Sequence, residues 1–335
     1  MLSRIPEYEV ELRFEKFSKS LSELKKKNGK KYDFILKAGE AYTSALFKLY
    51  KSVWDSESFP EDWRRTTIVQ LPKGKMDPAD LDGRRNIHVK LDTYKHFGQL
   101  VMDEVKGDLH RNMSKYQLGT KPGHRSQEHI YVLKSLISFS QCLDSGVIIT
   151  LYDISKFFDR ENIYDVLDEA FKSGVKGKAY RLLFEMNRKS KIKVKTPLGN
   201  TEEAETKAHL GQGTVEGAIL SANSIYKGVG EYLGDENDIN YGTLVVKSLL
   251  FQDDIASASR TIESAQSKND KMEAMLETKL LDLNDLKSVV LVTGTDEFQK
   301  NFLERVNMTT LTIYKKPMKR VNEYSYLGIS CIREG

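Results

Sequence analysis

The run VIITLY, residues Val147–Tyr152, constrains the fold of this chain more than any other feature. It carries no charge, it ends at Asp153, and helical patterns follow it at about residues 161–173 and 177–188. A short apolar run of this kind is typical of a strand that is buried on both faces. We therefore expect a sheet built around this strand, with helices packed on it.

Elsewhere the spacing of apolar residues predicts a mixture of helices and strands. Three- and four-residue spacings predict helices through about residue 55 and over 92–105, 128–143, 214–232 and the segment SAQSKNDKMEAMLETKLL. Strands are predicted at TTIVQLPKGK, on both sides of FQDD, at KSVVLVTG and from TTLTIY onward, and KIKVKTPLGNTEEAET predicts a hairpin with its turn at Gly199–Asn200. This order predicts an α+β fold with helices packed on one sheet.

Length and composition exclude several classes of protein. A chain of 335 residues corresponds to roughly two domains and can bury a substantial core. No apolar run approaches the roughly 18 residues that span a bilayer. Because the N-terminal residues MLSRIPEYEV are charged and lack an apolar stretch, we expect no secretory signal. Two cysteines are too few for a disulfide framework or a structural zinc site. We expect an intracellular protein, nuclear or cytoplasmic, with no membrane partner.

Basic residues are only slightly in excess of acidic residues, but they are grouped along the chain. Lysine and arginine number 52 against 48 acidic residues, a formal net charge of +4, which by itself indicates no nucleic-acid partner. Five basic runs lie between apolar segments: Lys25–Lys31, Trp63–Arg65, Gly83–Arg85, Asn187–Lys195 and Tyr314–Arg320. Each run alone is typical of a solvated face, but together they indicate a basic surface for nucleic acid.

Aspartates follow apolar segments at two places. Asp153 comes directly after VIITLY, and Asp253–Asp254 lie between LLF and IASAS. Carboxylates at strand ends are held rigidly, and three that converge offer the hard oxygen ligands that Mg²⁺ prefers. Two such ions, about 4 Å apart, activate an attacking hydroxyl and stabilise a leaving pyrophosphate. An adjacent pair of aspartates is also typical of an ordinary turn, so the interpretation depends on the motifs around it.

These acids belong to an ordered series of short motifs. Along the chain the motifs are LPKGK (71–75), GRRNI (83–87), YQLGTKPGHRSQEHI (116–130), DISKFFD (153–159), LGQG (210–213), FQDD (251–254), the lysine of LNDLKSVVL (287) and YLG (326–328). The series resembles the reverse transcriptases, most closely those of non-long-terminal-repeat (LINE-like) retrotransposons and group II introns. The resemblance extends over about residues 60–330.

The resemblance implies a catalytic role for four residues. Asp153 would bind both Mg²⁺ ions (Mn²⁺ being an alternative metal), Asp253 would be the principal ligand in the hairpin, and Asp254 would support it. Lys287 would neutralise or protonate the pyrophosphate. The alternative for Lys287 is a lysine that only meets solvent.

The resemblance also assigns residues to the nucleotide. Phe158, five residues after Asp153, would lie under the sugar and exclude a 2′-hydroxyl, so that deoxynucleotides are preferred; the alternative is that Phe158 is ordinary core beside Phe157. Gln212 and Gly213 would lie along the incoming nucleotide and the template, since glycine allows a close approach of the backbone.

Two basic residues and one short motif complete the implied site. Lys73 and Arg85 would hold the triphosphate, because a planar guanidinium grips phosphate oxygens with two hydrogen bonds. Arg84 is adjacent, so the assignment of Arg85 could be displaced by one residue. The primer grip would consist of Tyr326, Leu327 and Gly328.

The implied fold is the right-hand polymerase fold. Residues 1–55 would form an N-terminal helical extension, 56–145 the fingers, and 146–330 a palm with an antiparallel sheet. The thumb would be largely missing, with no endonuclease or RNase H region. The implied function is that of an RNA-directed DNA polymerase of a retroelement, a nucleotidyltransferase that uses an RNA template, a DNA or RNA primer and deoxynucleoside triphosphates.

Two other functions remain open at this point. One is a catalytically silent remnant that binds nucleic acid, which the intact acids disfavour. The other is a viral RNA-dependent RNA polymerase, which tends to have a second acid where this chain has Phe158. The chain also departs from the reverse-transcriptase pattern at Gln252, where a small residue is usual, at Gly217, and at Thr120 and Lys121. None of these departures removes an expected metal ligand.

Overall fold

The computed structural model describes residues 11–28, 37–73, 83–142, 146–206, 210–226, 233, 239–241, 244–306 and 311–332. Gly74 and Lys75, the end of the LPKGK motif, lie outside these residues. The chain divides into two compact units. Unit 1 comprises residues 1–112 and 162–220, and unit 2 comprises residues 113–161 and 221–335. Each unit therefore consists of two separate stretches of chain.

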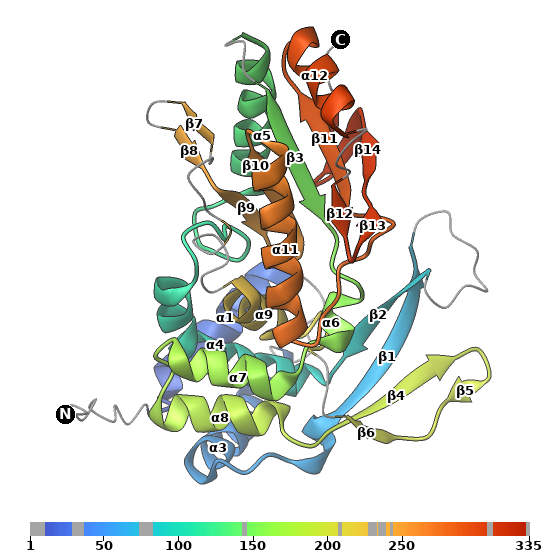
Figure 1. The fold of residues 1–335 in the computed structure, drawn as a ribbon. Coiled ribbons are helices and arrows are strands. Elements are labelled where there is room, and N and C mark those ends of the chain that lie inside the picture. The colour runs from blue at the N-terminus through green and yellow to red at the C-terminus, as the bar shows by residue number, and fades with distance from the viewer. Residues whose placement is uncertain are drawn as a thin grey trace, which may run out of the picture. The chain divides into compact units, whose positions relative to one another are not determined.

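Unit 1 contains helices and a mixed sheet (Figure 1). Its helices are α1 (Phe14–Asn28), α3 (Gly39–Ser56), the 3₁₀ helix η2 (Glu61–Arg64), α4 (Asp92–Asn112), α7 (Ile163–Lys172) and α8 (Gly177–Asn187). Its strands are β1 (Arg65–Pro72), β2 (Arg84–Val89), β4 (Ser190–Thr196), β5 (Gly199–Asn200) and β6 (Ala204–Thr206). The strand order is β2-β1-β4-β5, with β6 also paired to β4. β1 and β4 run parallel, and the other pairs are antiparallel.

An aromatic cluster forms much of the core of unit 1. The ring of Phe97 on α4 lies 5.2–5.9 Å, centroid to centroid, from the rings of Trp54, Phe59 and Trp63. All four residues are buried. The hydroxyl of Tyr50, also buried, donates a 2.7 Å hydrogen bond to the carbonyl of Thr93. Large rings in edge-to-face contact bury much apolar area, so this cluster fixes α3 and η2 against α4.

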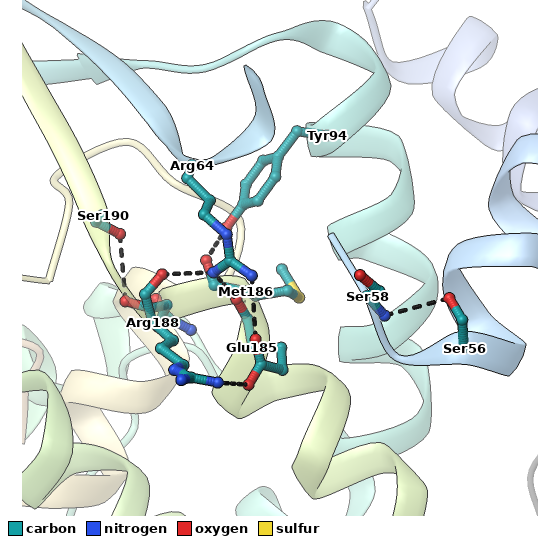
Figure 2. Close-up of polar contacts among 9 residues, drawn as sticks. Ser56, Ser58, Arg64, Tyr94, Glu185, Met186, Arg188 and Ser190 are labelled. Carbon is teal, nitrogen blue, oxygen red and sulfur yellow. Dashed lines mark hydrogen bonds and ion pairs between the residues drawn. The ribbon is translucent and has the colours of Figure 1, made fainter. Parts of the chain in front are cut away.

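A guanidinium ties η2 to the end of α8 in the same unit. Figure 2 shows Arg64 donating to the carbonyls of Glu185 (3.1 Å) and Arg188 (2.7 Å) and to the Glu185 carboxylate (3.1 Å). The last carbonyls of a helix have no partner within the helix, and a cation there also favours the helix dipole. Arg64 thus closes α8 at the point where the chain enters β4.

Unit 2 is built on a second sheet. Its strand order is β14-β11-β3-β10-β9, formed by β3 (Val147–Tyr152), β9 (Ser248–Phe251), β10 (Asp254–Ser259), β11 (Val289–Thr293) and β14 (Lys319–Val321). β14 pairs parallel to β11, and the other three pairs are antiparallel. The helices are α5 (Ser126–Cys142), α6 (Phe157–Arg160), α11 (Ile262–Thr278) and α12 (Asp296–Val306), and α9 (Gly217–Tyr226) enters the unit at Ser221. Three hairpins pair β7 (Ile239–Tyr241) with β8 (Leu244–Val246), β12 (Thr312–Ile313) with β13 (Lys316–Pro317), and β15 (Glu323–Tyr326) with β16 (Ile329–Ile332).

The strand β3 is buried over its whole length, as its sequence predicts. Side chains alternate between the two faces of a strand. On one face Ile149 and Leu151 pack in a cluster with Leu133 and Leu136 of α5. On the other face lies α11, and Figure 1 shows the two helices on opposite sides of this sheet. A strand covered on both faces needs the continuous apolar run that β3 has.

The predicted α+β class is confirmed, and most predicted elements are present within a few residues of the expected bounds. Two expectations are wrong. The helices do not pack on one sheet, because the described residues form two five-stranded sheets, one in each unit. The β4–β5 turn is Pro197–Leu198 rather than Gly199–Asn200, since Thr196 pairs with Gly199 and proline favours a turn over a strand.

Residues 1–10 and 29–36 of the expected N-terminal helical region, and 227–232 of the expected 214–232 helix, lie outside the described residues. The helix α12 was not predicted. In the part of the chain that is described, no helix combines the length and the apolar character needed to cross a membrane.

Candidate active site

Three of the predicted catalytic residues lie in one row across the sheet of unit 2. In the β10–β3 pair Ile255 lies opposite Tyr152, and in the β11–β3 pair Val289 lies opposite Leu151. Asp153 follows β3 directly, and Asp254 is the first residue of β10, next to the Ile255–Tyr152 pair. On the other side the β11–β3 pairing ends at Val289 and Leu151, and Lys287 lies in the turn that precedes β11. Lys287 Nζ lies 4.0 Å from Asp153 Oδ2, and Asp153 is near enough to Asp254 for its charge to act on that carboxyl, so the two acids and the lysine form a row at the ends of three neighbouring strands.

The face that carries this row is the one covered by α5. Asp153 alternates with Ile149 and Leu151, whose side chains pack in the α5 cluster. Tyr326 is buried in the same cluster, and Tyr324 packs against it. The hairpin β15–β16 therefore contributes to the face on which the acids lie.

The acids of this row perturb one another. Burial against neighbouring atoms and then the negative charges of Asp253 and Asp153 raise the pKa of Asp254 to about 6, although the residue keeps an exposed surface. Like charges held close together disfavour the ionised form of each. Lys287 Nζ lies 4.0 Å from Asp153 Oδ2, with its side chain 63% exposed. The row is thus an accessible, net negative group with one adjacent cation.

The backbone around Asp153 is held by the segment that leads into β11. The amide of Asp153 donates a 3.1 Å hydrogen bond to the hydroxyl of Ser288, which is fully buried. The carbonyl of Asp153 accepts a 2.7 Å bond from the amide of Asn284, and the amide of Ser155 donates to the carbonyl of Asp282. Both backbone groups of Asp153 are therefore fixed by residues more than a hundred positions away. None of the sequence motifs indicates a role for Ser288 or Asn284.

Asp253 lies in the two-residue loop that joins β9 to β10. Phe251 and Asp254 form the last pair of the ladder, so Gln252 and Asp253 alone make the turn. Gln252 has φ 55°, the left-handed region that a side chain with a Cβ disfavours. Two-residue hairpin loops require positive φ values because of the twist of the strands, and glycine or asparagine usually supplies them. The predicted turn is confirmed, with an unusual residue at its strained position.

Phe158 lies on the short helix α6, five residues beyond Asp153. Its ring is half-buried, packs against the α11-side cluster and contacts Phe157 edge-on at 5.1 Å between centroids. Phe157 is the buried member of the pair. Phe158 therefore has both a packed side and a solvent-accessible side.

The motif YLG forms the turn of the β15–β16 hairpin. Tyr326 pairs with Ile329, and Leu327 and Gly328 have φ values of 50° and 79°. Tyr324, which the sequence analysis missed, is half-buried, and burial followed by the charges of Asp254 and Asp153 raises its pKa. Its hydroxyl therefore stays protonated at neutral pH. The sequence signal for Tyr324 is its spacing from Tyr326 in the segment EYSY, because residues two apart on a strand share a face.

The predicted triphosphate-binding residues lie in unit 1, at one end of the β1–β2 hairpin. Leu71 pairs with Arg85 and Pro72 with Arg84, and the amide of Lys73 donates a 2.7 Å bond to the carbonyl of Gly83. Arg85 is exposed and Arg84 half-buried. Adjacent strand residues point to opposite faces, so a ligand on one face of the β1–β2 hairpin can contact only one of the two arginines.

The loop LGQG lies against β2 in the same unit. The carbonyl of Gln212 accepts a 2.9 Å bond from the amide of His88. Gly213 has φ 96°, and a Cβ there would lie 3.6 Å from Ile87. The positive φ favours glycine at this position. The expected role, a close approach of the backbone to the nucleotide, favours glycine as well. Lys73, Arg85, Gln212 and Gly213 thus border the same strand of unit 1.

The expected metal site is not preformed by the side chains as they stand. Within the described ranges, no group of three or more aspartate, glutamate, histidine or cysteine side chains is arranged to hold a metal ion. The donors nevertheless have the right chemistry, because Asp153, Asp253 and Asp254 are hard oxygen ligands. The charges of Asp253 and Asp153 also repel that of Asp254, and a bound cation would relieve this repulsion.

Comparison with known proteins adds evidence on the fold. No protein-family model matches the chain, and no curated protein matches its sequence. Among solved structures, the chain is similar to an apo telomerase from Candida tropicalis truncated from its C-terminal domain, with a TM-score of 0.52 and 12% sequence identity. The match covers 86% of this chain and 58% of the telomerase chain, so this chain spans somewhat more than half of that structure's length.

The fold is reverse-transcriptase-like. This likeness agrees at a coarse level with the resemblance that the motifs indicate, and it says nothing about the retroelement type. The finer division into an N-terminal extension, fingers and palm remains a prediction. Within this reverse-transcriptase-like fold, unit 2 brings together Asp153, Asp254 and Lys287, and unit 1 brings together the four residues along β2.

Proposed function

We propose that this chain is an RNA-directed DNA polymerase of a retroelement, which adds deoxynucleotides to a DNA or RNA primer on an RNA template. The observation that carries the proposal is the row of Asp254, Asp153 and Lys287 at the ends of three neighbouring strands. A structural role for two adjacent, mutually repelling carboxylates at an accessible sheet end is costly, and perturbed pKa values of this kind concentrate at functional sites.

Asp153, Asp253 and Asp254 would hold the Mg²⁺ ions of this reaction, with Mn²⁺ as an alternative. When bound, divalent ions lower the pKa of the attacking hydroxyl and neutralise charge on the phosphates. The chain's own contribution is to fix the carboxylates. The hydrogen bonds of Asp153 to Ser288 and Asn284 hold one acid on a buried strand, and a site built on such elements is more precise than one on a loop.

The remaining residues of the proposed mechanism bind and orient the nucleotide. Lys287, beside Asp153, would neutralise or protonate the leaving pyrophosphate, for which its exposed ammonium is accessible. The accessible side of the Phe158 ring would select against a 2′-hydroxyl. In unit 1, Lys73 and Arg85 would bind the triphosphate, and the backbone of Gln212–Gly213 would lie along the nucleotide and template.

A primer-extension assay tests the proposal directly. The purified chain is given an RNA template, an annealed primer, deoxynucleotides and Mg²⁺, and is compared with Asp253→Asn and, as a matched control, the exposed Asp165→Asn of α7. We expect extension by the wild type and the control. Extension by Asp253→Asn should fall by at least about a thousandfold, since a lost metal ligand removes charge stabilisation from the transition state. Thermal unfolding should change little in either variant, because both side chains are exposed.

Other outcomes point to the other functions. Normal extension by Asp253→Asn contradicts the assignment of the metal site. A wild-type chain that binds primer–template but extends nothing, with Mg²⁺ or Mn²⁺, indicates a silent nucleic-acid-binding remnant. Preference for ribonucleotides over deoxynucleotides indicates an RNA-dependent RNA polymerase.

A further inference from the structure

The side chain of Gln117 is joined to the loop that carries Asp253. Gln117 is fully buried and lies between α4 and α5 in the sequence, within the YQLG motif. Its Oε1 accepts a 3.0 Å hydrogen bond from the amide of Gln252, and its Nε2 donates a 3.4 Å bond to the carbonyl of the same residue. One side-chain amide therefore pairs with both backbone groups of the strained turn residue.

The orientation of the Gln117 amide follows from its neighbours. Oε1 accepts a second hydrogen bond, 2.8 Å long, from the amide of Gly119. Both backbone amides can only donate, and the Gln252 carbonyl can only accept. With the amide flipped, all three backbone groups would face partners of the wrong kind. The three hydrogen bonds are therefore mutually consistent in one orientation alone.

The backbone around Gln117 is itself anchored to β9. The amide of Leu118 donates a 2.9 Å bond to the carbonyl of Leu250, and the amide of Leu250 donates a 3.3 Å bond to the carbonyl of Tyr116. The peptide of Gly119 lies so close that a Cβ on this residue would come within 2.6 Å of the Gln252 nitrogen. The segment 116–119 thus follows β9 as far as the turn, and the Gln117 side chain continues the pairing where backbone pairing ends.

Gln252 needs such support because its conformation is unfavourable. Its φ of 55° is disfavoured for any residue with a side chain, and a half-buried peptide without partners is unstable. We propose that Gln117 is a positioning residue, whose side-chain amide fixes the Gln252 peptide and through it the carboxylates of Asp253 and Asp254. The catalytic consequence rests on the function proposed above, whereas the effect on the turn does not.

The first experiment measures the turn without any substrate. Gln117→Met keeps the length of the side chain and removes all three hydrogen bonds. We expect amide hydrogen exchange at Gln252 to rise at least tenfold, while exchange at Ala256 in the middle of β10 stays within about twofold. The matched control is Gln299→Met on α12, where the buried amide donates a 2.9 Å bond to the Gly294 carbonyl at the opposite end of β11. This control should leave the exchange of Gln252 unchanged.

The second experiment measures primer extension by the same proteins. We expect Gln117→Met to lower kcat by about 10- to 100-fold, the scale on which small misplacements of reacting groups act. KM for the primer–template should stay within about twofold, because no contact with nucleic acid is removed. Gln299→Met should leave kcat unchanged.

A rescue variant separates positioning from packing. Gln252→Gly adopts a positive φ without strain, so the double variant Gln117→Met/Gln252→Gly should regain at least tenfold in kcat over Gln117→Met. If Gln117→Met alone does not fold, the double variant carries the test, and its folding and extension support the proposal. A double variant that gains nothing, or does not fold either, shows that Gln117 is only core.

The two proposals fail in different ways. Unchanged exchange at Gln252 in Gln117→Met overturns the positioning role, whatever the activity. Increased exchange in a chain that extends no primer supports the role of Gln117 in the turn and contradicts the polymerase function instead.

Discussion

At the scale of one residue, Phe158 is partly packed and partly accessible, as a residue proposed to contact the sugar of a nucleotide has to be. Its ring contacts Phe157 on one side and remains partly accessible on the other. Because only part of the ring is buried, truncation leaves most of the local core in place.

We predict that Phe158→Val admits ribonucleotides. The smaller side chain removes the collision with a 2′-hydroxyl, a discrimination worth roughly 1–3 kcal/mol or 10- to 200-fold. The measurement is the ratio of kcat/KM for a ribonucleotide and the matching deoxynucleotide. Phe171→Val, on an accessible phenylalanine of unit 1, is the control and should leave this ratio unchanged. If Phe158→Val lost stability while the ratio of the two kcat/KM values stayed the same in the residual activity, Phe158 would be only a core residue.

Glu161 is an ionisable residue in the interior of unit 2. It is 3% exposed, and neither carboxylate oxygen makes a hydrogen bond to any described residue. Burial raises its pKa to about 8, although the Ser224 hydroxyl and the Lys279 charge are near enough to oppose this shift. The folded state therefore binds a proton that the unfolded state releases near pH 4.5.

The sign of the resulting pH dependence is that stability falls as pH rises. Between about pH 4.5 and pH 8, the free energy of unfolding should decrease by up to roughly 1.4 kcal/mol per pH unit from this group. Glu161→Gln removes this contribution, so urea unfolding should find the variant more stable than the wild type at pH 8, with a smaller difference at pH 5. Glu277→Gln on α11, an exposed control, should follow the wild type at both values. If the free energy of unfolding of Glu161→Gln changed with pH in the same way as that of the wild type, the raised pKa of Glu161 would be contradicted.

At the scale of elements, one hydroxyl adds a hydrogen bond beyond the end of the β3–β11 pairing. Ser288 precedes β11 and accepts the amide of Asp153, so it connects the two strands where the acids lie. A lost acceptor leaves a partly buried amide without this partner, and the cost for a buried group is about 1–3 kcal/mol.

We predict that Ser288→Ala lowers both stability and kcat. The free energy of unfolding should fall by about 1–3 kcal/mol, and kcat for primer extension should fall about tenfold because the Asp153 backbone loses one of its two restraints. Ser140→Ala is the matched control, because Ser140 is equally buried in unit 2 and its hydroxyl donates to the carbonyl of Ile137. It should lose stability without losing kcat. Equal kcat values for the two variants would show that Ser288 only stabilises the fold.

For the whole molecule, binding of nucleic acid should depend on the basic runs. On β4, Lys191, Lys193 and Lys195 share one face because they are two residues apart. Lys191 forms an ion pair with Glu61, and Lys195 is exposed. A strand face of this charge is suited to phosphates, which bind without regard to base sequence.

We predict that Lys193→Ala/Lys195→Ala weakens primer–template binding equally for all sequences. The slope of log Kd against log salt concentration should fall by about 0.9 for each phosphate contact removed. Lys172→Ala is the control, since Lys172 on α7 is already paired with Asp168 and Glu169. An unchanged slope in the double variant would exclude β4 from the binding surface.

Local sequence determined the elements of this fold. The uncharged run of β3, the periodicity of α4, α5 and α11, and the turn at Gln252–Asp253 follow from properties of neighbouring residues, because burial and backbone preference act over a few positions. The same local patterns placed Asp153 and Asp254 at strand ends. They misplaced the β4–β5 turn by two residues, where a proline outweighed a glycine–asparagine pair.

Only the tertiary structure decided how these elements pair. The pairing of β3 with β10 and β11 brings Asp254 and Lys287 close to Asp153, although these residues are about a hundred or more positions apart, and no local pattern encodes this pairing. Ser288, Tyr324 and Gln117 gain their roles from the same long-range pairing. The division into two units, each from two stretches of chain, is likewise a result of strand pairing and core packing. The physical reason is that the sequence specifies the type of each side chain, whereas the hydrogen bonds and contacts that orient the side chains form between distant segments of the chain.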